Sequence, residues 1–269
     1  MRWIKIKLRY VFCIIILILA IVIVFNIIIK RNNNVKEAVK IPILLYHEFV
    51  KVVPDSDLDN YSYINTPQSF EENIKTLLEN GYTFISFNEL NDANNGKIKL
   101  PSKPILITMD DGYYSNYEYI YPILEKYNVK ASIFIVTDNI GKEVDGKKYL
   151  DWEQCLKMEE SRLVEIYSHS KRHIFYNRFS LKTIVSDVKN SYKDIEEKLG
   201  KRELKVFAYP YGAYTKQSVL ALKLIGIDMQ VYDIGINYYN KFNNSYIKRI
   251  NIPCEMTGEE IIQEINNTN

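Results

Sequence analysis

The chain has 269 residues, of which 47% are hydrophobic and 25% are charged. This composition is typical of a globular protein that is large enough to bury a substantial core. The 35 lysines and arginines nearly balance the 33 acidic residues and leave a formal net charge of +2. A near-neutral chain lacks the basic surface of nucleic-acid-binding domains, so we expect no nucleic acid partner.

The amino-terminal segment has the composition of a membrane span. The run from Val11 to Ile29 contains one polar side chain, Asn26, and no charge, which is the pattern of a transmembrane helix. Basic residues dominate the segment before it, and the positive-inside bias places the amino terminus in the cytoplasm. A cleaved signal peptide is the alternative, although the apolar run exceeds a usual signal-peptide core and no small-residue cleavage site follows it.

We therefore expect one membrane anchor followed by one extracellular domain, or a secreted domain if the anchor is cleaved. The expected segments are a cytoplasmic basic segment at 1–10, a transmembrane signal-anchor at 11–29, a polar linker at 30–40 and a domain at 41–269. That domain contains only Cys155 and Cys254. Two cysteines make no disulfide framework, and we expect two unpaired, partly buried thiols.

Along the domain, short apolar runs alternate with helical patterns. One helix is expected to open at Thr66 and Pro67 and to close at Gly81. A second runs from Ser180 to Gly200 with one apolar face, and a third starts at Thr257 with a capping box. The expected strands are Ile43–Tyr46, Phe84–Phe87, Ile105–Met109, Ser132–Val136, Leu163–Tyr167, Val206–Tyr209, Met229–Tyr232 and Tyr246–Ile250.

Strands separated by helices predict parallel pairing with right-handed crossovers. About seven such units favour a distorted (β/α) barrel, and an open doubly wound sheet is the alternative because strand order is not visible in the sequence. The unusual polar residues follow the ends of these strands, where such barrels build their active sites. They are His47, Asp110, Asp111, His169 and the Pro210-Tyr211-Gly212 turn.

Asp110 and Asp111 are adjacent carboxylates at a predicted strand end. Their side chains point in different directions, so one can bind a metal while the other handles protons. Gly112 allows a tight turn directly afterwards. An ordinary Asp-Gly turn is the alternative for this tripeptide alone.

His169 and His173 lie four residues apart, and on a helical turn both rings would reach one metal ion. Two histidines and a carboxylate are the three-ligand set of a catalytic zinc site with an open position for water. Two histidines at this spacing are, on their own, equally typical of a solvated surface.

The third motif is the segment from Phe207 to Gly212, in which Pro210 and Gly212 constrain the backbone. This constraint would present the amide of Tyr211 to a developing oxyanion. A plain strand-to-loop turn with aromatic packing is the alternative for this motif alone.

The three motifs, in this order, resemble the polysaccharide deacetylase (NodB homology) family, also called carbohydrate esterase family 4. The family's T-F-D-D-G motif corresponds to Thr108–Gly112, its H-[ST]-x-x-H motif to His169–His173, and its P-Y-G motif to Pro210–Gly212. The resemblance runs from about Ile41 to the carboxyl terminus and is nearest to the poly-N-acetylglucosamine deacetylase-like subgroup.

The resemblance implies a metal-dependent hydrolysis of the acetamide of N-acetylated sugars. Asp111, His169 and His173 would hold a divalent metal, commonly zinc, and Asp110 would be the general base. Two histidines and one aspartate also suit cobalt or nickel. The ion and the Tyr211 amide would stabilise the tetrahedral oxyanion.

The general acid is expected at His47, because no histidine follows His173 and Ile43–His47 resembles the segment that supplies the acid in this subgroup. A core histidine is the alternative. Tyr209 stands where many members carry an arginine that orients the base, and Tyr167 stands where a small residue is common and would narrow the site or alter its substrate.

The expected substrate is an N-acetylglucosamine-containing polysaccharide of the cell wall or the extracellular space. A non-catalytic glycan-binding protein and an amidase acting on a non-sugar C–N bond are the alternatives. The loop Glu48–Asn65 is expected to line the cleft.

Overall fold

The computed structural model of the protein describes residues 39–53 and 63–268. The predicted cytoplasmic segment, membrane span and most of the linker lie outside the described residues. Within the described part, no helix combines the length and the apolar composition that a bilayer span requires. The compact unit that contains the described residues from Lys40 onward begins at that residue.

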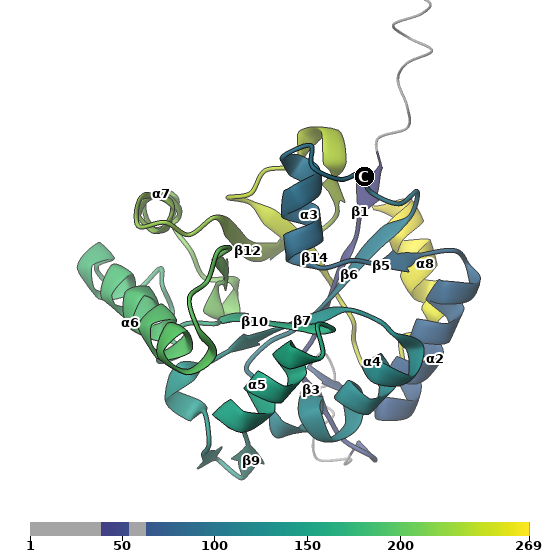
Figure 1. Ribbon diagram of the computed structural model, residues 1–269, viewed down its shortest axis with the longest axis horizontal. Coiled ribbons are helices and arrows are strands. Elements are labelled where there is room, and N and C mark those ends of the chain that lie inside the picture. Colours follow the sequence, from purple (N-terminus) through teal and green to yellow (C-terminus); the bar gives the residue numbers. More distant parts are fainter. Residues whose placement is uncertain (1–38, 54–62, 269) are drawn as a thin grey trace, which may run out of the picture. The chain divides into compact units, whose positions relative to one another are not determined.

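Seven parallel strands close into a barrel (Figure 1). The first, β2 (Ile43–Tyr46), pairs with both β6 (Pro104–Met109) and β14 (Ile247–Asn251), which closes the sheet. The remaining strands, in order from β14 to β6, are β12 (Met229–Ile234), β11 (Val206–Ala208), β10 (Val164–Ser168) and β7 (Ala131–Ile135). The predicted barrel is confirmed, and the open sheet is wrong because its two edges pair.

The barrel is distorted at one seam. Strands β10 and β7 share five register pairs, whereas β10 and β11 share only the pair Ser168 and Phe207. Short strand pairs decorate the barrel: β5 (Thr83–Phe84) beside β6, β1 (Lys40–Ile41) with β13 (Asn237–Tyr238), β3 (Glu48–Phe49) with β4 (Ile64–Asn65), and β8 (Glu143–Val144) with β9 (Lys147–Lys148).

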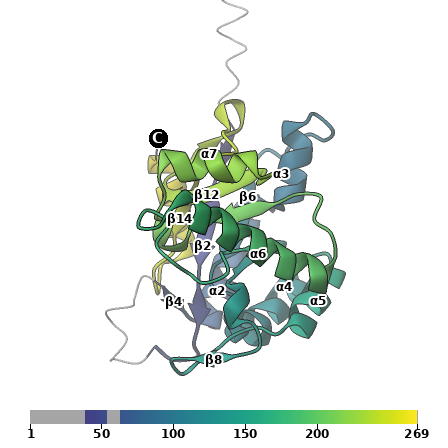
Figure 2. The ribbon, with the colours of Figure 1, turned by 90° about the vertical axis from the view of Figure 1, so that its left-hand side faces the viewer.

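Helices surround the barrel on the outside (Figures 1 and 2). They are α2 (Pro67–Glu79), α3 (Phe87–Asn94), α4 (Tyr121–Tyr127) preceded by the π-helical turn η2 (Asn116–Ile120), α5 (Trp152–Glu160), α6 (Leu181–Leu199), α7 (Lys216–Leu224) and α8 (Gly258–Asn267). Three single 3-10 turns complete the description: η3 (Thr137–Asn139), η4 (Pro210–Gly212) and η5 (Tyr239–Lys241).

The three predicted helices are confirmed, and their capping residues act as the sequence indicated. The side chains of Thr66, Ser180 and Thr257 each accept a hydrogen bond from the backbone of the first turn. Gly200 follows the last residue of α6.

The predicted strand Phe84–Phe87 is wrong in its second half. The strand ends at Phe84, and helix α3 begins at Phe87. Ser86 and Glu89 form a capping box, with the serine side chain bound to the backbone of Glu89 and the glutamate bound to the backbone of Ser86. The cap satisfies two backbone donors at the start of the helix. The chain therefore forms a helix here rather than continuing the strand.

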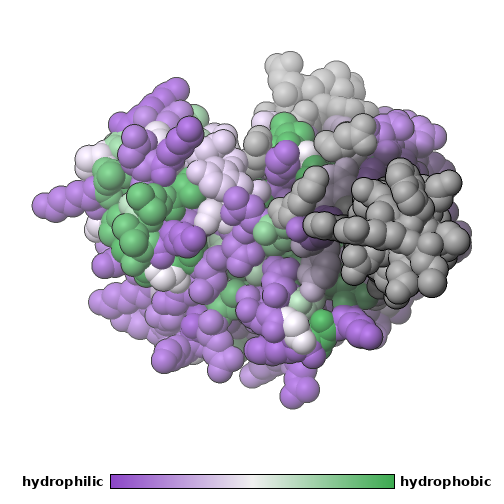
Figure 3. All heavy atoms as spheres, turned by 90° about the horizontal axis from the view of Figure 1, so that it is seen from above, coloured by the Kyte–Doolittle hydropathy of each residue, from purple (hydrophilic) through white to green (hydrophobic). Residues whose placement is uncertain are grey.

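Inward-pointing apolar side chains fill the barrel, including Ile43, Leu106, Phe134, Tyr167 and Ile247. Residues of α3 belong to the same cluster, so this helix covers the barrel at the amino end of its strands. Both described cysteines are free and buried. Seen from above, the surface is largely hydrophilic, with an apolar area on the side where α7 lies (Figure 3); Leu220 and Leu224 of this helix are exposed.

Candidate active site

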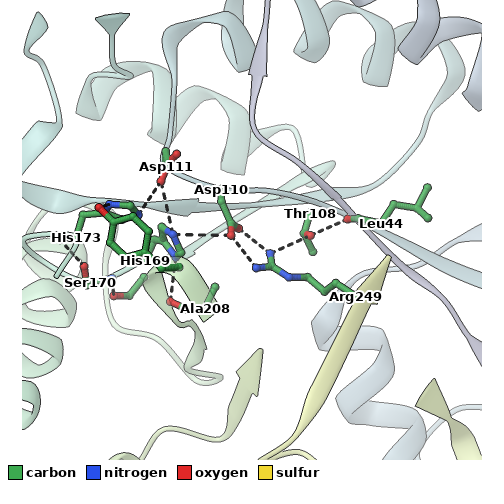
Figure 4. A network of polar contacts seen from close by, with 11 residues as sticks. Leu44, Thr108, Asp110, Asp111, His169, Ser170, His173, Ala208 and Arg249 are labelled. Carbon is green, nitrogen blue, oxygen red and sulfur yellow. Dashed lines mark hydrogen bonds and ion pairs between the residues drawn. The ribbon is translucent and has the colours of Figure 1, made fainter. Parts of the chain in front are cut away.

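A sharp turn after β6 sets the directions of the two adjacent carboxylates. Asp111 and Gly112 both have left-handed backbone conformations, with φ of 71° and 79°. A Cβ atom on Gly112 would lie 2.9 Å from Cγ2 of Ile135 in β7. Only glycine allows both the conformation and this close approach. The turn sends Asp110 and Asp111 in different directions, as the sequence predicted (Figure 4).

Asp110 is clamped by an arginine that the sequence analysis missed. Both carboxylate oxygens of Asp110 accept hydrogen bonds of 2.7 Å from the guanidinium of Arg249, which comes from β14 (Figure 4). The same guanidinium donates to Oγ1 of Thr108 at 3.3 Å. Asp110 and Arg249 are 2% and 4% exposed, so this is a buried bidentate ion pair.

The ion pair keeps the carboxylate of Asp110 ionised. Burial raises the pKa of Asp110, but Arg249 and His169 more than offset burial, and the pKa is lower than that of an ordinary aspartate. Tyr209, the residue at the usual arginine position, instead donates its hydroxyl proton to Gln230 in the core. Arg249 therefore makes the contact with Asp110 that, by the resemblance, an arginine at position 209 would make.

Three of the predicted residues form a compact group of metal-ligand atoms. Oδ1 of Asp111 lies 3.5 Å from Nε2 of His169 and 3.2 Å from Nε2 of His173. Zinc bonds of about 2.0–2.2 Å at tetrahedral angles place neighbouring ligand atoms about 3.3–3.5 Å apart. The donor set and its spacing therefore fit a divalent metal ion.

A hydrogen bond at the far side of the His169 imidazole favours its metal-binding tautomer. Nδ1 of His169 lies 2.9 Å from the carbonyl oxygen of Ala208, which can only accept, so Nδ1 carries the proton and Nε2 offers its lone pair. Nδ1 of His173 lies 3.1 Å from the hydroxyl of Tyr211.

The environment also sets the protonation states that metal binding requires. Burial lowers the pKa of His169 to about 4, and this ring is therefore neutral at pH 7. Burial raises the pKa of Asp111, but the hydrogen bond with His173 and the other histidines bring it below the ordinary value, so the carboxylate is ionised.

The two histidines do not lie on a helical turn, contrary to the sequence prediction. The segment 169–173 is a loop in which Ser170 and His173 have positive φ, 79° and 52°. Ser170 Oγ accepts a hydrogen bond from the amide of His173 at 2.8 Å. The loop, rather than a helix, brings both rings to the same point.

His47 follows β2 and lines the same cavity as Asp110 and Asp111. Its carbonyl oxygen accepts a hydrogen bond from Nδ2 of Asn116 at 2.9 Å, and its ring packs edge-on against Tyr63. Nδ1 is buried and has no hydrogen-bond partner in the described part of the chain. Burial lowers the pKa of His47; Arg249 acts in the same direction, and both aspartates oppose it.

Tyr211 lies in η4 with a left-handed backbone, φ 58°. The structure shows no acceptor for its amide among the described residues, so the N–H is available to a ligand. Its ring stacks on Phe175 with centroids 3.8 Å apart and is 57% exposed.

All six predicted site residues line one cavity of about 740 Å³ at the carboxyl ends of the strands. Glu48, Tyr63 and Ile64 contribute to it from the predicted cleft loop, of which residues 54–62 lie outside the described residues. Tyr113, Tyr232 and Lys147 also line it.

Tyr167 is not among the described residues that line this cavity. It lies inside the barrel, and its hydroxyl donates to Glu165 at 3.0 Å, so the expectation that it narrows the site is wrong.

Comparisons with known proteins agree with this geometry. Residues 97–230 match a family model described as polysaccharide deacetylase. YxkH of Bacillus subtilis, named for the same family, is 31% identical over 71% of this chain and 64% of its own length. The poly-beta-1,6-N-acetyl-D-glucosamine N-deacetylase of Staphylococcus aureus is 28% identical over 64% of this chain and 61% of its own.

This chain thus spans a little under two thirds of the length of both curated relatives. Among solved structures, the deacetylase PplD of Streptococcus pyogenes, in complex with acetate, superposes with a TM-score of 0.75 at 25% identity. That superposition covers 85% of this chain and 99% of PplD.

Proposed function

Because this chain belongs to the polysaccharide deacetylase family, we propose that it hydrolyses the acetamide of N-acetylated sugars in an extracellular or cell-wall polysaccharide, with a divalent metal. The observation that carries the proposal is the adjacency, in one cavity, of the Arg249-clamped Asp110 and the Asp111–His169–His173 group.

The metal, zinc or else cobalt or nickel, would polarise the acetamide carbonyl and lower the pKa of the attacking water. Asp111, His169 and His173 are the residues that would hold it. Asp110 accepts the proton of the water: it stays ionised beside Arg249, and its Oδ2 lies 3.8 Å from Nε2 of His169, next to the ligand atoms.

Two further groups act on the acetamide. The Tyr211 amide donates a hydrogen bond to the oxygen that becomes negatively charged. In its protonated form, which the neighbouring carboxylates of Asp110 and Asp111 favour against burial, His47 donates a proton to the departing nitrogen from Nε2, the ring atom opposite its buried Nδ1. Its position in the cavity and its location after a strand that neighbours both β6 and β14 support this assignment.

The aromatic lining of the cavity supports a sugar substrate. Tyr63, Tyr113, Tyr211 and Tyr232 surround the candidate site, and their rings offer apolar faces together with polar hydroxyls, which suits a pyranose. We take the class of polymer from the relatives and propose an N-acetylglucosamine polysaccharide.

We also propose the location of the enzyme. Residues 11–29 would anchor it in the cell membrane as a single span, with residues 1–10 in the cytoplasm, 30–40 as a linker and the domain 41–269 outside. The uncharged apolar run and its basic flanks support this arrangement.

The test is acetate release by the purified full chain from N-acetylglucosamine oligomers before and after metal removal. Treatment with a chelator is expected to stop release, and added zinc, cobalt or nickel is expected to restore it. Zinc binding without acetate release from any N-acetylated sugar would favour a glycan-binding protein or a non-sugar amidase instead.

A further inference from the structure

A buried aspartate of α6, Asp187, lies directly behind the loop that carries His169 and His173. Its side chain is fully shielded from solvent. Oδ2 accepts hydrogen bonds from the amide of Lys171 at 3.0 Å and from the hydroxyl of Tyr176 at 2.8 Å, and Oδ1 accepts one from Nε of Arg172 at 2.6 Å. One carboxylate thus ties together the middle of the loop and the segment after it.

The loop needs such support because its backbone is strained. Ser170 and His173 are non-glycine residues with positive φ, and such conformations persist only where the surroundings fix them. The neighbouring backbone groups are held as well: the carbonyl of Ser170 accepts from Thr137 N, and the carbonyl of Lys171 accepts from Asp138 N. Asp187 accepts the hydrogen bond of the Lys171 amide, and Lys171 is the middle residue between the two histidines.

A second aspartate of α6, Asp194, also contacts this region and can be compared with Asp187. Asp194 lies two turns further along the helix and binds the side chains of Lys171, at 2.6 Å, and Thr137, at 2.8 Å, but no backbone group of the loop. Asp187 therefore acts on the loop backbone, whereas Asp194 contacts side chains.

We propose that Asp187 is a positioning residue of the candidate metal site, which holds the 169–173 loop in the conformation where both histidines reach one ion. The proposal rests on the proposed function in one respect, that Asp111, His169 and His173 bind a divalent metal. Asp187 binds the loop rather than either imidazole, and we take as a guide the loss of outer hydrogen-bond partners of metal ligands, which commonly costs about 10–100-fold in metal affinity.

The test is zinc affinity of the full chain, measured by competition with a chromogenic chelator well below the melting temperature. Asp187→Asn keeps the size of the side chain but replaces one acceptor oxygen with a donor that faces existing donors. We expect zinc binding to weaken by about 10–100-fold. Asp194→Asn makes the same chemical change on the same helix and is expected to leave zinc affinity within about twofold, since Asp194 binds side chains and not the backbone of the loop.

Tyr176→Phe removes one of the three hydrogen bonds to Asp187 and serves if Asp187→Asn does not fold. We expect it to weaken zinc binding in the same direction by a smaller factor. A folded Asp187→Asn or Tyr176→Phe protein with unchanged zinc affinity, even with a lower melting temperature, would overturn the proposal. If the unaltered protein itself binds no zinc, the proposed metal-dependent function fails too, and the two failures are thereby distinguished.

Discussion

At the scale of single residues, the site depends on charges that are buried in matched pairs. Asp110 and Arg249 are both nearly inaccessible to water, and each satisfies the other through two short hydrogen bonds. An unpaired charge at either position would be costly to bury. The pair therefore fixes both the ionisation and the orientation of the proposed base.

Replacing Arg249 with glutamine tests this role. Arg249→Gln removes the bidentate clamp, and the misplaced base is expected to lower kcat about 100-fold. Zinc affinity should change little, because Arg249 contacts no ligand atom of the metal group. The matched control is Lys248→Gln, an exposed neighbour on the same strand. Equal kcat values for the two variants would contradict the role of Arg249.

The buried imidazole of His169 predicts how stability depends on pH. Its pKa is about 4 in the folded protein and 6.5 ordinarily, so the unfolded chain binds a proton that the folded chain does not. The free energy of unfolding of the metal-free protein is thus expected to fall as pH decreases from about 6.5 to about 4, by about 3 kcal/mol at most, and this term is constant below that window.

Urea denaturation at a series of pH values measures this effect. The lowered pKa of His47 acts in the same direction. The variant His169→Gln should show a shallower decrease than the unaltered protein, because one of the two histidines no longer titrates. An identical slope in both proteins would show that His169 does not titrate as described.

At the scale of elements, neighbouring strands supply the site, and the turn after β6 decides where the carboxylates point. Gly112→Ala places a methyl group against Ile135 in a backbone conformation that alanine disfavours. We expect a loss of more than about 1 kcal/mol of stability together with weaker zinc binding, since Asp111 moves with the turn.

Gly141→Ala is the matched control for that substitution. Gly141 has a similar φ, +74°, but no atom lies within 4 Å of the position that a Cβ would occupy. It reports the cost of the backbone conformation alone, and chemical denaturation compares the two. Equal losses would mean that the contact with Ile135 contributes nothing.

The elements also show what the sequence could reveal. His47, Asp110, Asp111 and His169 were identified because each directly follows an apolar run, and a parallel barrel gathers strand ends at one rim. Arg249 was missed because its partner is contributed by β6, and only the order β14–β2–β6 makes the two neighbours. The available signal was the alternation along this strand, which places Arg249 on the same face as the apolar Ile247.

Two other differences come from local backbone chemistry. The predicted strand was extended to Phe87, the first residue of α3, because apolar residues follow β5 closely and the capping box at Ser86 was not recognised. The histidine pair was placed on a helical turn because spacing alone does not reveal that Ser170 and His173 adopt positive φ. In both places, side-chain hydrogen bonds to the backbone decided the conformation.

At the scale of the whole molecule, the described domain is stabilised without a disulfide bond. Cys155 and Cys254 are 0% and 4% exposed, and burial raises the pKa of both thiols. We expect neither thiol to react with an alkylating reagent until the domain unfolds, so labelling should follow the global unfolding transition.

Peptide mapping by mass spectrometry after labelling in increasing urea checks this expectation and separates these cysteines from Cys13. Rapid alkylation of Cys254 in the native protein would contradict it. Stability that depends on oxidant would contradict the description of the domain as disulfide-free.

The most direct test of the account compares the unaltered protein with Asp110→Asn in two measurements on the same samples, acetate release from N-acetylglucosamine oligomers and zinc affinity. Asp92→Asn, at a half-buried aspartate of α3 that pairs with Lys97, controls for the substitution itself. The account predicts that Asp110→Asn still binds zinc but releases no acetate, while the control behaves like the unaltered protein. Undiminished acetate release by Asp110→Asn would contradict the proposed role of this residue and the chemistry built on it.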